Sequence, residues 1–280
     1  FIDLILRNEF QTYVIPGDTL KIVSDLDPKL DYKNAVKLEG VFEEIRNYYS
    51  KKHEKLGYWE LSDPITSFSN IKKPIEKVFS LCDSLFKNEM DFLNNYQSTY
   101  PLPHWFYEIM KTDIEYNKVL IRPYLISYRK FFYKENIIHP EAYYKFDQIN
   151  LYNPKAKLSV YYYDCIDNYL ITRHEEGLEG KHGVDRALPI IARSIPEAKE
   201  ILKDDILEYY LAHKVSELFS FSRSINDFTR VDSLYKRIQP QFNNKEIIEI
   251  LNNQRTYLAN YFETVRKSPF TYSKIIPADN

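Results

Sequence analysis

The chain has 280 residues, of which 44% are hydrophobic and 28% are charged, and its formal net charge at pH 7 is −2. There are enough apolar residues for a sizeable core, which argues against an intrinsically disordered chain. The small net charge argues against a protein that holds a phosphate backbone by charge, so we expect no nucleic-acid partner. This length suits one large domain or two ordinary ones.

Glycine is scarce and unevenly placed. The chain has six glycines, with none between Gly57 and Gly177 and none after Gly183. Tight hairpins and phosphate-binding loops need residues with positive φ, a conformation that only glycine adopts at little cost. The long glycine-free stretches therefore predict helices. The glycine patterns of a P-loop and of a dinucleotide-binding fold do not occur, which excludes both kinds of nucleotide site.

Only the first 23 residues have the pattern of β-strands. Residues 2–6 alternate between apolar and polar side chains, and the Pro-Gly-Asp sequence at residues 16–18 is typical of a type II turn between two apolar runs. Because two or three strands are marginally stable alone, we expect residues 1–33 to be the end of a small β domain whose first strands either precede Phe1 or are missing.

From residue 34 to residue 280 the apolar residues recur at helical spacing. We predict a mainly α fold, an irregular antiparallel array or bundle of helices. One helical pattern starts at residue 35 and ends at Gly57, and another ends at the Pro-Leu-Pro of residues 101–103, because proline disfavours helix in the preceding residue. The next begins at His104, and Pro123 should kink or split it.

The helix predicted at residues 153–170 is the central strut of this array. Asn153 has the side chain of an N-cap, and Pro154 suits the first helical position. Its apolar residues recur on one face at three- and four-residue steps: Leu158, Tyr162, Cys165, Ile166, Tyr169 and Leu170.

A loop-like stretch with three glycines follows at residues 175–185, where we expect a mobile segment or a subdomain break. The rest of the chain is again helical in pattern. Pro196 should open a short helix, and Asn243 with Glu246 resembles the capping box of the final helix.

The two cysteines, Cys82 and Cys165, stand far apart, and no Cys-x-x-Cys occurs. This spacing excludes a zinc knuckle and a thioredoxin-type redox pair within the chain. Whether the two cysteines pair with each other cannot be deduced from their spacing. Each lies on an apolar helical face, so we interpret them as small buried core residues.

Catalytic and metal-binding patterns are absent: neither His-Glu-x-x-His nor Gly-x-Ser-x-Gly occurs. The closest approach to a metal site is the loop that contains His174, His182 and three glutamates, Glu175, Glu176 and Glu179. The glycines of this loop would leave such ligands without a fixed geometry. A solvated charged loop is favoured over a hydrolase site. We predict no catalytic residue, no metal and no cofactor.

The aromatic-rich bend at residues 100–107 is the candidate binding surface, with His104, Trp105 and Tyr107 as its binding residues. An exposed aromatic edge between two helices can recognise a peptide or a glycan. The same residues can instead fill a packed corner, and we favour the corner because aromatic rings are more often buried.

Three stretches, taken together, resemble a known family. They are residues 13–22 with their strand–Pro-Gly-Asp–strand pattern, residues 151–170 with their Leu-Tyr-Asn-Pro start, and residues 206–246. Their order and spacing are similar to the region that precedes the catalytic domain in TlpA-like thioredoxin-family proteins of the bacterial cell envelope. In that family a small β domain is followed by a helical domain and then by a thioredoxin fold with Cys-x-x-Cys.

The resemblance covers nearly the whole chain, but no thioredoxin domain follows, so no redox residue can be carried over. It implies a non-catalytic, periplasmic or cell-envelope helical domain that positions or recognises protein partners for thiol–disulfide chemistry done elsewhere. The alternative is a stand-alone envelope protein that binds a peptide or a glycan. No run approaches the ~20 apolar residues of a membrane helix. We therefore expect no transmembrane segment, and an export signal or lipid anchor upstream of Phe1.

Overall fold

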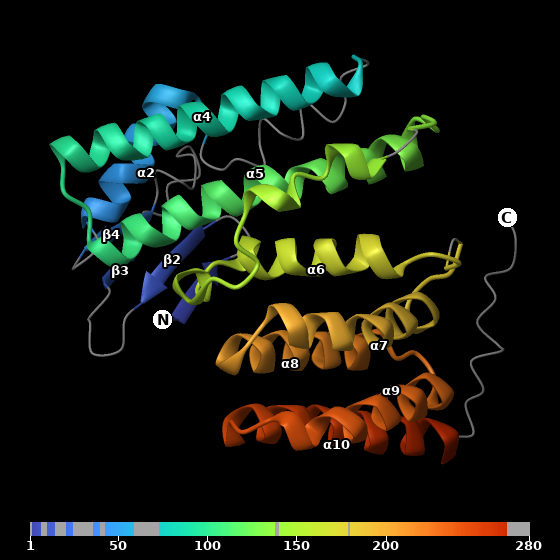
Figure 1. Cartoon of the computed structure of the whole chain (residues 1–280). Helices are drawn as coiled ribbons and strands as arrows, with labels where there is room; N and C mark the ends of the chain where they lie inside the picture. Colours follow the sequence, from blue (N-terminus) through green and yellow to red (C-terminus); the bar gives the residue numbers. More distant parts are fainter. Residues whose placement is uncertain are drawn as a thin grey trace, which may run out of the picture. The chain divides into compact units, whose positions relative to one another are not determined.

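The computed structural model describes residues 2–6, 10–14, 21–24, 36–39, 43–58, 73–137, 140–178 and 180–267. Over these residues the chain is mainly helical, as predicted (Figure 1). Its contacts divide it into two compact units, Phe1–Tyr144 and Lys145–Asn280, which we call unit 1 and unit 2. The predicted break at residues 175–185 lies inside unit 2.

Unit 1 begins with two antiparallel strand pairs. Strand β1 (Ile2–Leu6) pairs with β2 (Phe10–Val14), and β3 (Lys21–Ser24) pairs with β4 (Val36–Glu39). The predicted turn at residues 16–18 and the predicted boundary near residue 33 lie outside the described residues. That these strands belong to a small β domain stays a prediction.

The first described helix, α2 (Glu43–Leu56), begins later than the helical pattern suggested. Residues 36–39 have the sequence Val-Lys-Leu-Glu, whose strict alternation suits the strand β4 better than a helix. The predicted end is confirmed, because Gly57 follows α2 with φ of +82° and its N–H donates to the carbonyl of His53 at 2.9 Å.

Helices α4 (Ile75–Thr99) and α5 (His104–Phe132) form an antiparallel hairpin. Their direction follows from two cross-helix hydrogen bonds, Tyr107 to Asn94 and Arg122 to Asp83. The predicted stop at residues 101–103 is confirmed. Of the two outcomes predicted at Pro123, the split is wrong, since α5 continues through it to Phe132, and the kink stays a prediction. Leu125 and Ile126, two and three residues after the proline, are at most 1% exposed, and their packing offsets the hydrogen bond that proline cannot make.

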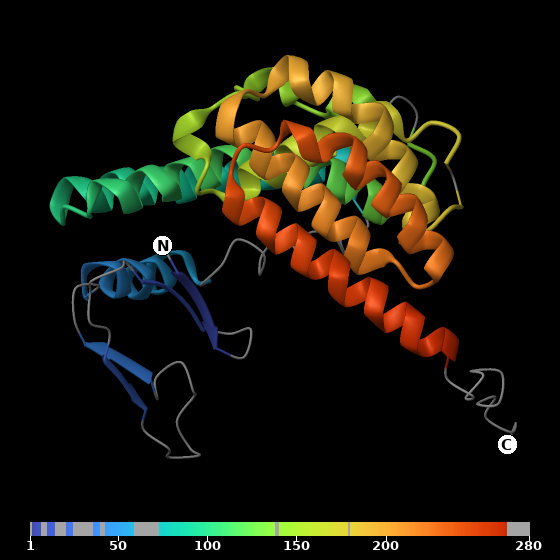
Figure 2. The ribbon, with the colours of Figure 1, turned by 90° about the horizontal axis from the view of Figure 1, so that it is seen from below.

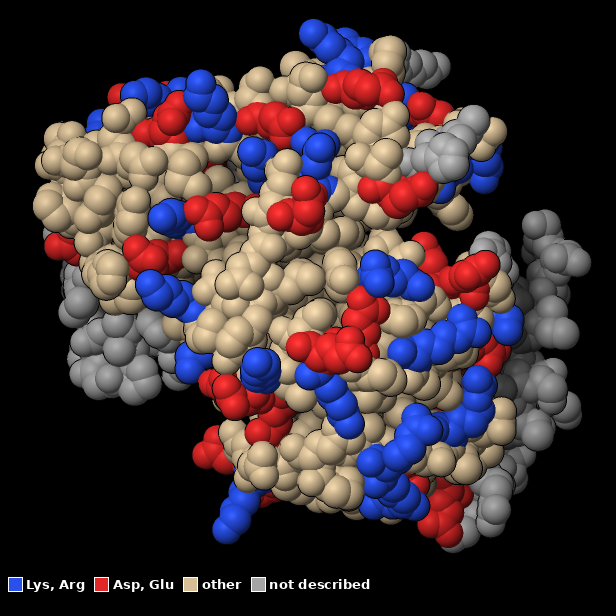
Figure 3. All heavy atoms as spheres, viewed as in Figure 1, with Lys and Arg blue, Asp and Glu red and all other residues tan. Residues whose placement is uncertain are grey.

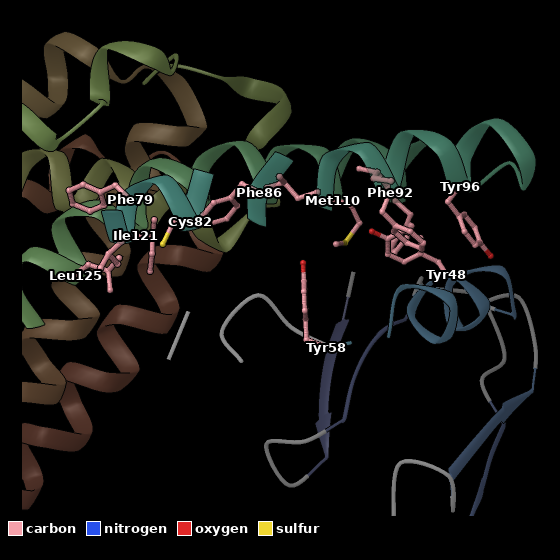
Figure 4. Close-up of a cluster of buried hydrophobic side chains, with 14 of the residues drawn as sticks. Tyr48, Tyr58, Phe79, Cys82, Phe86, Phe92, Tyr96, Met110, Ile121 and Leu125 are labelled. Carbon is pink, nitrogen blue, oxygen red and sulfur yellow. The ribbon is translucent and has the colours of Figure 1, made fainter. Parts of the chain in front are cut away.

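The core of unit 1 is rich in aromatic rings (Figure 4). Tyr48 of α2 is fully buried, and its ring centroid lies 5.5 Å from that of Phe92, 5.3 Å from that of Tyr96 and 5.5 Å from that of Phe106. Edge contacts of this kind add to the free energy gained by burying the rings. They join α2 to both arms of the α4–α5 hairpin.

Unit 2 is an array of shorter helices: α6 (Val160–His174), α7 (Val184–Ile201), α8 (Asp204–Phe221), α9 (Ile225–Ile238) and α10 (Lys245–Lys267). Short 3-10 turns lie at Phe146–Gln148, Pro154–Ala156 and Gln239–Gln241. A further 3-10 turn, Pro140–Tyr143, ends unit 1.

Helices α6, α8 and α10 run parallel to one another, and α7 and α9 return between them (Figures 1 and 2). For α6 and α8, the parallel direction follows from two ion pairs, Lys157–Asp205 at 3.2 Å and Asp167–Lys214 at 2.9 Å. For α8 and α10, the parallel direction follows from the hydrogen bonds of Asn244 with Glu208 and of Gln254 with Ser216. Unit 2 is therefore a stack of paired helices that ends in α10.

The predicted strut begins later than its first cap suggested. Asn153 Oδ1 accepts the N–H of Lys155 at 3.2 Å, but it caps only the 3-10 turn Pro154–Ala156. The helix α6 begins at Val160, and the Ser159 hydroxyl caps it by accepting the N–H of Tyr162 at 3.2 Å. The buried face is confirmed for four of its predicted members: Tyr162, Cys165, Ile166 and Leu170.

Two further predictions in unit 2 are wrong in position. Pro196 does not open a helix, because α7 runs through both Pro189 and Pro196. The final helix α10 is capped by Asn244 and not by Asn243: the Asn244 Oδ1 atom accepts the N–H of Glu246 at 2.9 Å. None of the helices in the described part of the chain combines the length and the apolar character needed to cross a bilayer.

Candidate functional site

The predicted binding residues lie at the first turn of α5. His104 is exposed, and Trp105 is half-buried with its ring centroid 5.8 Å from that of Phe106, which is fully buried. The Tyr107 hydroxyl donates to Asn94 Oδ1 on α4 at 2.8 Å. Phe106 fills the inside of the corner, Trp105 and Tyr107 are partly buried against the core of unit 1, and of the three predicted residues only His104 is exposed. Their role in binding stays a prediction.

A second aromatic cluster, which the sequence analysis did not single out, lies at the other end of α5. It consists of five residues, and we call it the α5 aromatic patch: Tyr124, Tyr128, Phe131, Phe132 and Tyr133. Tyr124, Phe131 and Phe132 are 53%, 66% and 60% exposed. Contiguous exposed rings of this kind are typical of contact surfaces.

The five rings contact one another. The Tyr128 centroid lies 4.4 Å from that of Phe132, 6.0 Å from that of Tyr133 and 6.3 Å from that of Tyr124. The Phe131 ring meets the Phe132 ring edge-on at 4.9 Å. Because Tyr128 is half-buried beneath the others, it fixes their spacing, and the patch is one continuous surface of ring faces and edges.

The helix end fixes the patch in place. Lys134 has a φ of 53°, the left-handed conformation that ends a helix, and the N–H groups of Tyr133 and Glu135 donate to the carbonyl of Arg129 at 3.0 and 3.3 Å. The buried Arg129 side chain also binds the Glu135 carboxylate. These bonds hold the last turn of α5 together, so that the rings project from a rigid element.

The rim of the patch is positively charged. Lys130 and Lys134 are both exposed, and the Lys134 ammonium lies 5.1 Å from the centroid of Phe131. The nearest acid in sequence, Glu135, is already engaged by Arg129. A partner that covers this patch would therefore meet apolar rings, tyrosine hydroxyls and two cations.

The density of aromatic residues was the signal that could have identified the patch. Tyr128 and Phe132 have the spacing of the buried residues of α5, but Phe132 is 60% exposed. Near the end of a long helix the apolar face can extend beyond the helix it packs against. In that case periodicity no longer distinguishes core from surface.

The loop after α6 does not gather the histidines and glutamates that were weighed above as a metal site. His174 Nε2 lies 2.8 Å from Glu197 Oε2 on α7, and Tyr169 donates to the other oxygen of Glu197 at 3.0 Å. Glu175 binds Arg186 at 2.8 Å. Glu179 lies outside the described residues, and those that are described contain no group of three or more His, Cys, Asp or Glu placed to hold a metal.

Both cysteines are buried and free. Burial raises the pKa of Cys82 to about 11 and that of Cys165 to about 12. A thiol attacks a disulfide as its thiolate, and at neutral pH groups with these pKa values are almost fully protonated. They lie in different units and behave as core residues.

The face drawn in Figure 3 intersperses acidic and basic side chains with broad uncharged areas. Neither sign forms a continuous field on it. Charge alone therefore points to no ligand on this face, and the α5 aromatic patch is the best-formed surface feature of unit 1.

No protein-family model, curated protein or solved structure matches the chain.

Proposed function

We propose that this chain is a non-catalytic binding domain that recognises a protein partner through the α5 aromatic patch. The observation that carries the proposal is the exposure of a connected group of aromatic rings on a rigid helix end. Such rings gain free energy when a partner covers them, and they lose little side-chain entropy because packing already holds them.

The composition of the patch selects the kind of partner. Two exposed lysines border the rings, whereas Glu135 is neutralised by Arg129. We therefore expect a peptide segment that combines apolar side chains with Asp or Glu. The carboxylates would pair with Lys130 and Lys134, and the apolar groups would lie on the rings.

The resemblance to the region before the thioredoxin fold of TlpA-like proteins supports a finer proposal. The partner would be a component of a thiol–disulfide system in the periplasm or cell envelope, and the chain would position it and not react with it. The high pKa values of both thiols support the second half of this statement.

The binding proposal is tested with three labelled peptides of equal length, measured by fluorescence anisotropy. One peptide is acidic with phenylalanines, one is acidic with serines in their place, and one is basic with phenylalanines. The first should bind best. Phe131→Ala with Phe132→Ala should weaken its binding by about tenfold or more, because central rings are hot spots.

Trp105→Ala, at the opposite end of α5, is the matched control and should leave this affinity unchanged. If only Trp105→Ala weakens binding, the partner site is the predicted corner and the patch is not used. If no peptide binds but a glycan array gives a signal that depends on Phe131 and Phe132, the patch is a sugar-binding surface and the protein-partner proposal is wrong.

The non-catalytic part is tested by insulin reduction with dithiothreitol. The chain should not accelerate the reaction, with or without Cys82→Ser and Cys165→Ser. An acceleration that disappears in the serine variants would show that the buried thiols react, and it would refute the proposal.

A further inference from the structure

Three rings of the α5 aromatic patch form a ridge along one side of the helix. Tyr124, Tyr128 and Phe132 follow one another at four-residue steps, so that their side chains line up one above the other, and we call this row the α5 ridge. Neighbouring ring centroids along it are 6.3 and 4.4 Å apart. A further side chain needs roughly 7 Å between two rings to enter, because each carbon contact takes about 3.5 Å. The row therefore has no pocket between its rings, and it presents a raised surface roughly 12 Å long.

The α5 ridge offers a partner no row of free backbone groups such as the edge of a sheet. The backbone groups in the interior of α5 bond within the helix, and at its end the carbonyl of Arg129 accepts the N–H groups of Tyr133 and Glu135. An extended segment laid on the rings would bury backbone N–H and C=O groups without partners, which is costly. A helix bonds its own backbone groups and avoids this cost.

A second helix also has the shape that fits the α5 ridge. Side chains four residues apart form the ridges of a helix surface, and in helix pairs these ridges pack into the grooves of the partner. The partner makes such contacts through apolar residues at positions i, i+3, i+4 and i+7. About three turns of a helix are enough to cover the length of the α5 ridge.

The charge beside the rings sets the direction of that helix. Lys134 follows the last turn of α5, and its ammonium lies 5.1 Å from the ring centroid of Phe131. A carboxylate of a partner that covers Phe131 comes within reach of this ammonium. Because of the helix dipole, Asp and Glu stabilise a helix in its first turn and destabilise it in its last turn. The first turn of the partner therefore belongs at Lys134.

We propose that the α5 aromatic patch recognises its partner as an amphipathic α-helix that runs antiparallel to α5. The acidic first turn of this helix pairs with Lys134, and its apolar face receives the α5 ridge. The proposal rests on the proposed function and adds the conformation and the direction of the bound segment. A strand-like or polyproline segment of the same composition is not recognised.

Two labelled peptides of equal composition test the conformation by fluorescence anisotropy. Both have an acidic first turn and an apolar face, and they differ only in the place of one proline. In one peptide the proline takes the first helical position, where it is tolerated, and in the other it lies in the middle on the solvent side. The second peptide should bind about a hundredfold more weakly, because proline breaks the interior of a helix.

A second pair of peptides tests the direction. They have the same apolar face, and the two glutamates lie in the first turn of one peptide and in the last turn of the other. The first should bind about fivefold more tightly to the wild-type chain, and Lys134→Glu should abolish this preference. Lys87→Glu reverses an exposed lysine on α4, and as the matched control it should keep the preference.

The outcomes separate this proposal from the proposed function. Phe131→Ala with Phe132→Ala should weaken the binding of every helical peptide. If binding depends on these two rings but the central proline does not weaken it, the partner is extended, and the proposal is wrong while the proposed function stands. A tighter peptide with its glutamates in the last turn overturns the antiparallel direction. Binding that does not depend on Phe131 and Phe132 overturns the proposed function and this proposal with it.

Discussion

The two units bury their charges differently. In unit 1, Lys52 of α2 and Glu89 of α4 form an ion pair at 2.6 Å, and their side chains are only 3% and 1% exposed. The Tyr58 hydroxyl donates to the same carboxylate at 2.7 Å, and its ring lies 5.5 Å from the ammonium. Tyr58 points at α4 in Figure 4. This pair is enclosed by an aromatic core.

In unit 2, ion pairs between helices lie at the edges of the interfaces, where at least one partner is accessible to water. They join the helices of the stack to one another: Asp167–Lys214 (α6 to α8), Arg173–Glu197 (α6 to α7), Asp185–Arg230 (α7 to α9) and Asp232–Arg255 (α9 to α10).

The difference shows two uses of polar groups. A buried pair contributes little net stability compared with an apolar pair, but it strongly penalises any arrangement that separates it. It therefore fixes how α2 sits on α4 in a core whose rings could pack in several ways. The edge pairs of unit 2 cost less desolvation and align one short helix with the next. Breaking the buried pair should thus be far more damaging than breaking an edge pair.

The largest effect is expected for Glu89→Gln. This change leaves Lys52 buried without its countercharge, which should lower the free energy of unfolding by about 3–5 kcal/mol. Urea denaturation followed by circular dichroism measures it. The double change Lys52→Met with Glu89→Leu removes both charges and should recover most of the loss. If Glu89→Gln lowers the free energy of unfolding by less than about 1 kcal/mol, the Lys52–Glu89 pair is hydrated and the contrast between the two units is wrong.

An intermediate effect is expected for Asp232 in unit 2. Burial opposes ionisation of this carboxyl, but hydrogen bonds from Arg255 and Lys236 outweigh it and hold the pKa of Asp232 below its usual value. The exposed Lys236 is screened by solvent, so we expect Asp232→Asn to cost only about 1 kcal/mol at pH 7.

The pH dependence of Asp232→Asn follows from the sign of this shift. Because the pKa is lowered in the folded state, the carboxylate stabilises the fold above the unfolded-state pKa of about 3.9, and the contribution is lost as pH falls through the folded-state value. Unfolding curves of wild type and variant should therefore differ at pH 7 and converge as the pH falls below the folded-state pKa of Asp232. A difference that is constant with pH would mean that the carboxylate charge is not the cause.

The sequence was sufficient for the elements whose signals are local. The α4–α5 hairpin followed from apolar periodicity and from the prolines at residues 101–103, and Gly57 correctly ended α2. The split predicted at Pro123 and the helix start predicted at Pro196 were wrong, because both prolines lie inside helices whose packing compensates for the lost backbone hydrogen bond. Intrinsic preference is a weak term compared with burial, and burial is not visible in a single sequence.

The surface features could be predicted less well, because they depend on where packing stops. Phe132 has the spacing of a core residue and the exposure of a surface residue. The pairing of His174 with Glu197 needs α6 and α7 side by side, and no local pattern encodes it. The α5 aromatic patch became visible only when the exposed side of α5 was known.

The smallest effect concerns the start of α6, where two residues compete as caps. The Ser159 hydroxyl accepts the N–H of Tyr162 in the first turn of the helix, and Ser159 is only 2% exposed. Asn153 caps only the 3-10 turn that precedes α6. Ser159→Ala should therefore lower the free energy of unfolding by about 0.5 kcal/mol, the low end of the range for a lost N-cap, and Asn153→Ala by less. Ser159→Asp keeps an acceptor at the cap and is the control for the hydroxyl. Urea denaturation of the three variants measures the order. If Asn153→Ala costs more than Ser159→Ala, the helix begins where the sequence pattern placed it, and residues 154–159 belong to the strut and not to the turn that precedes it.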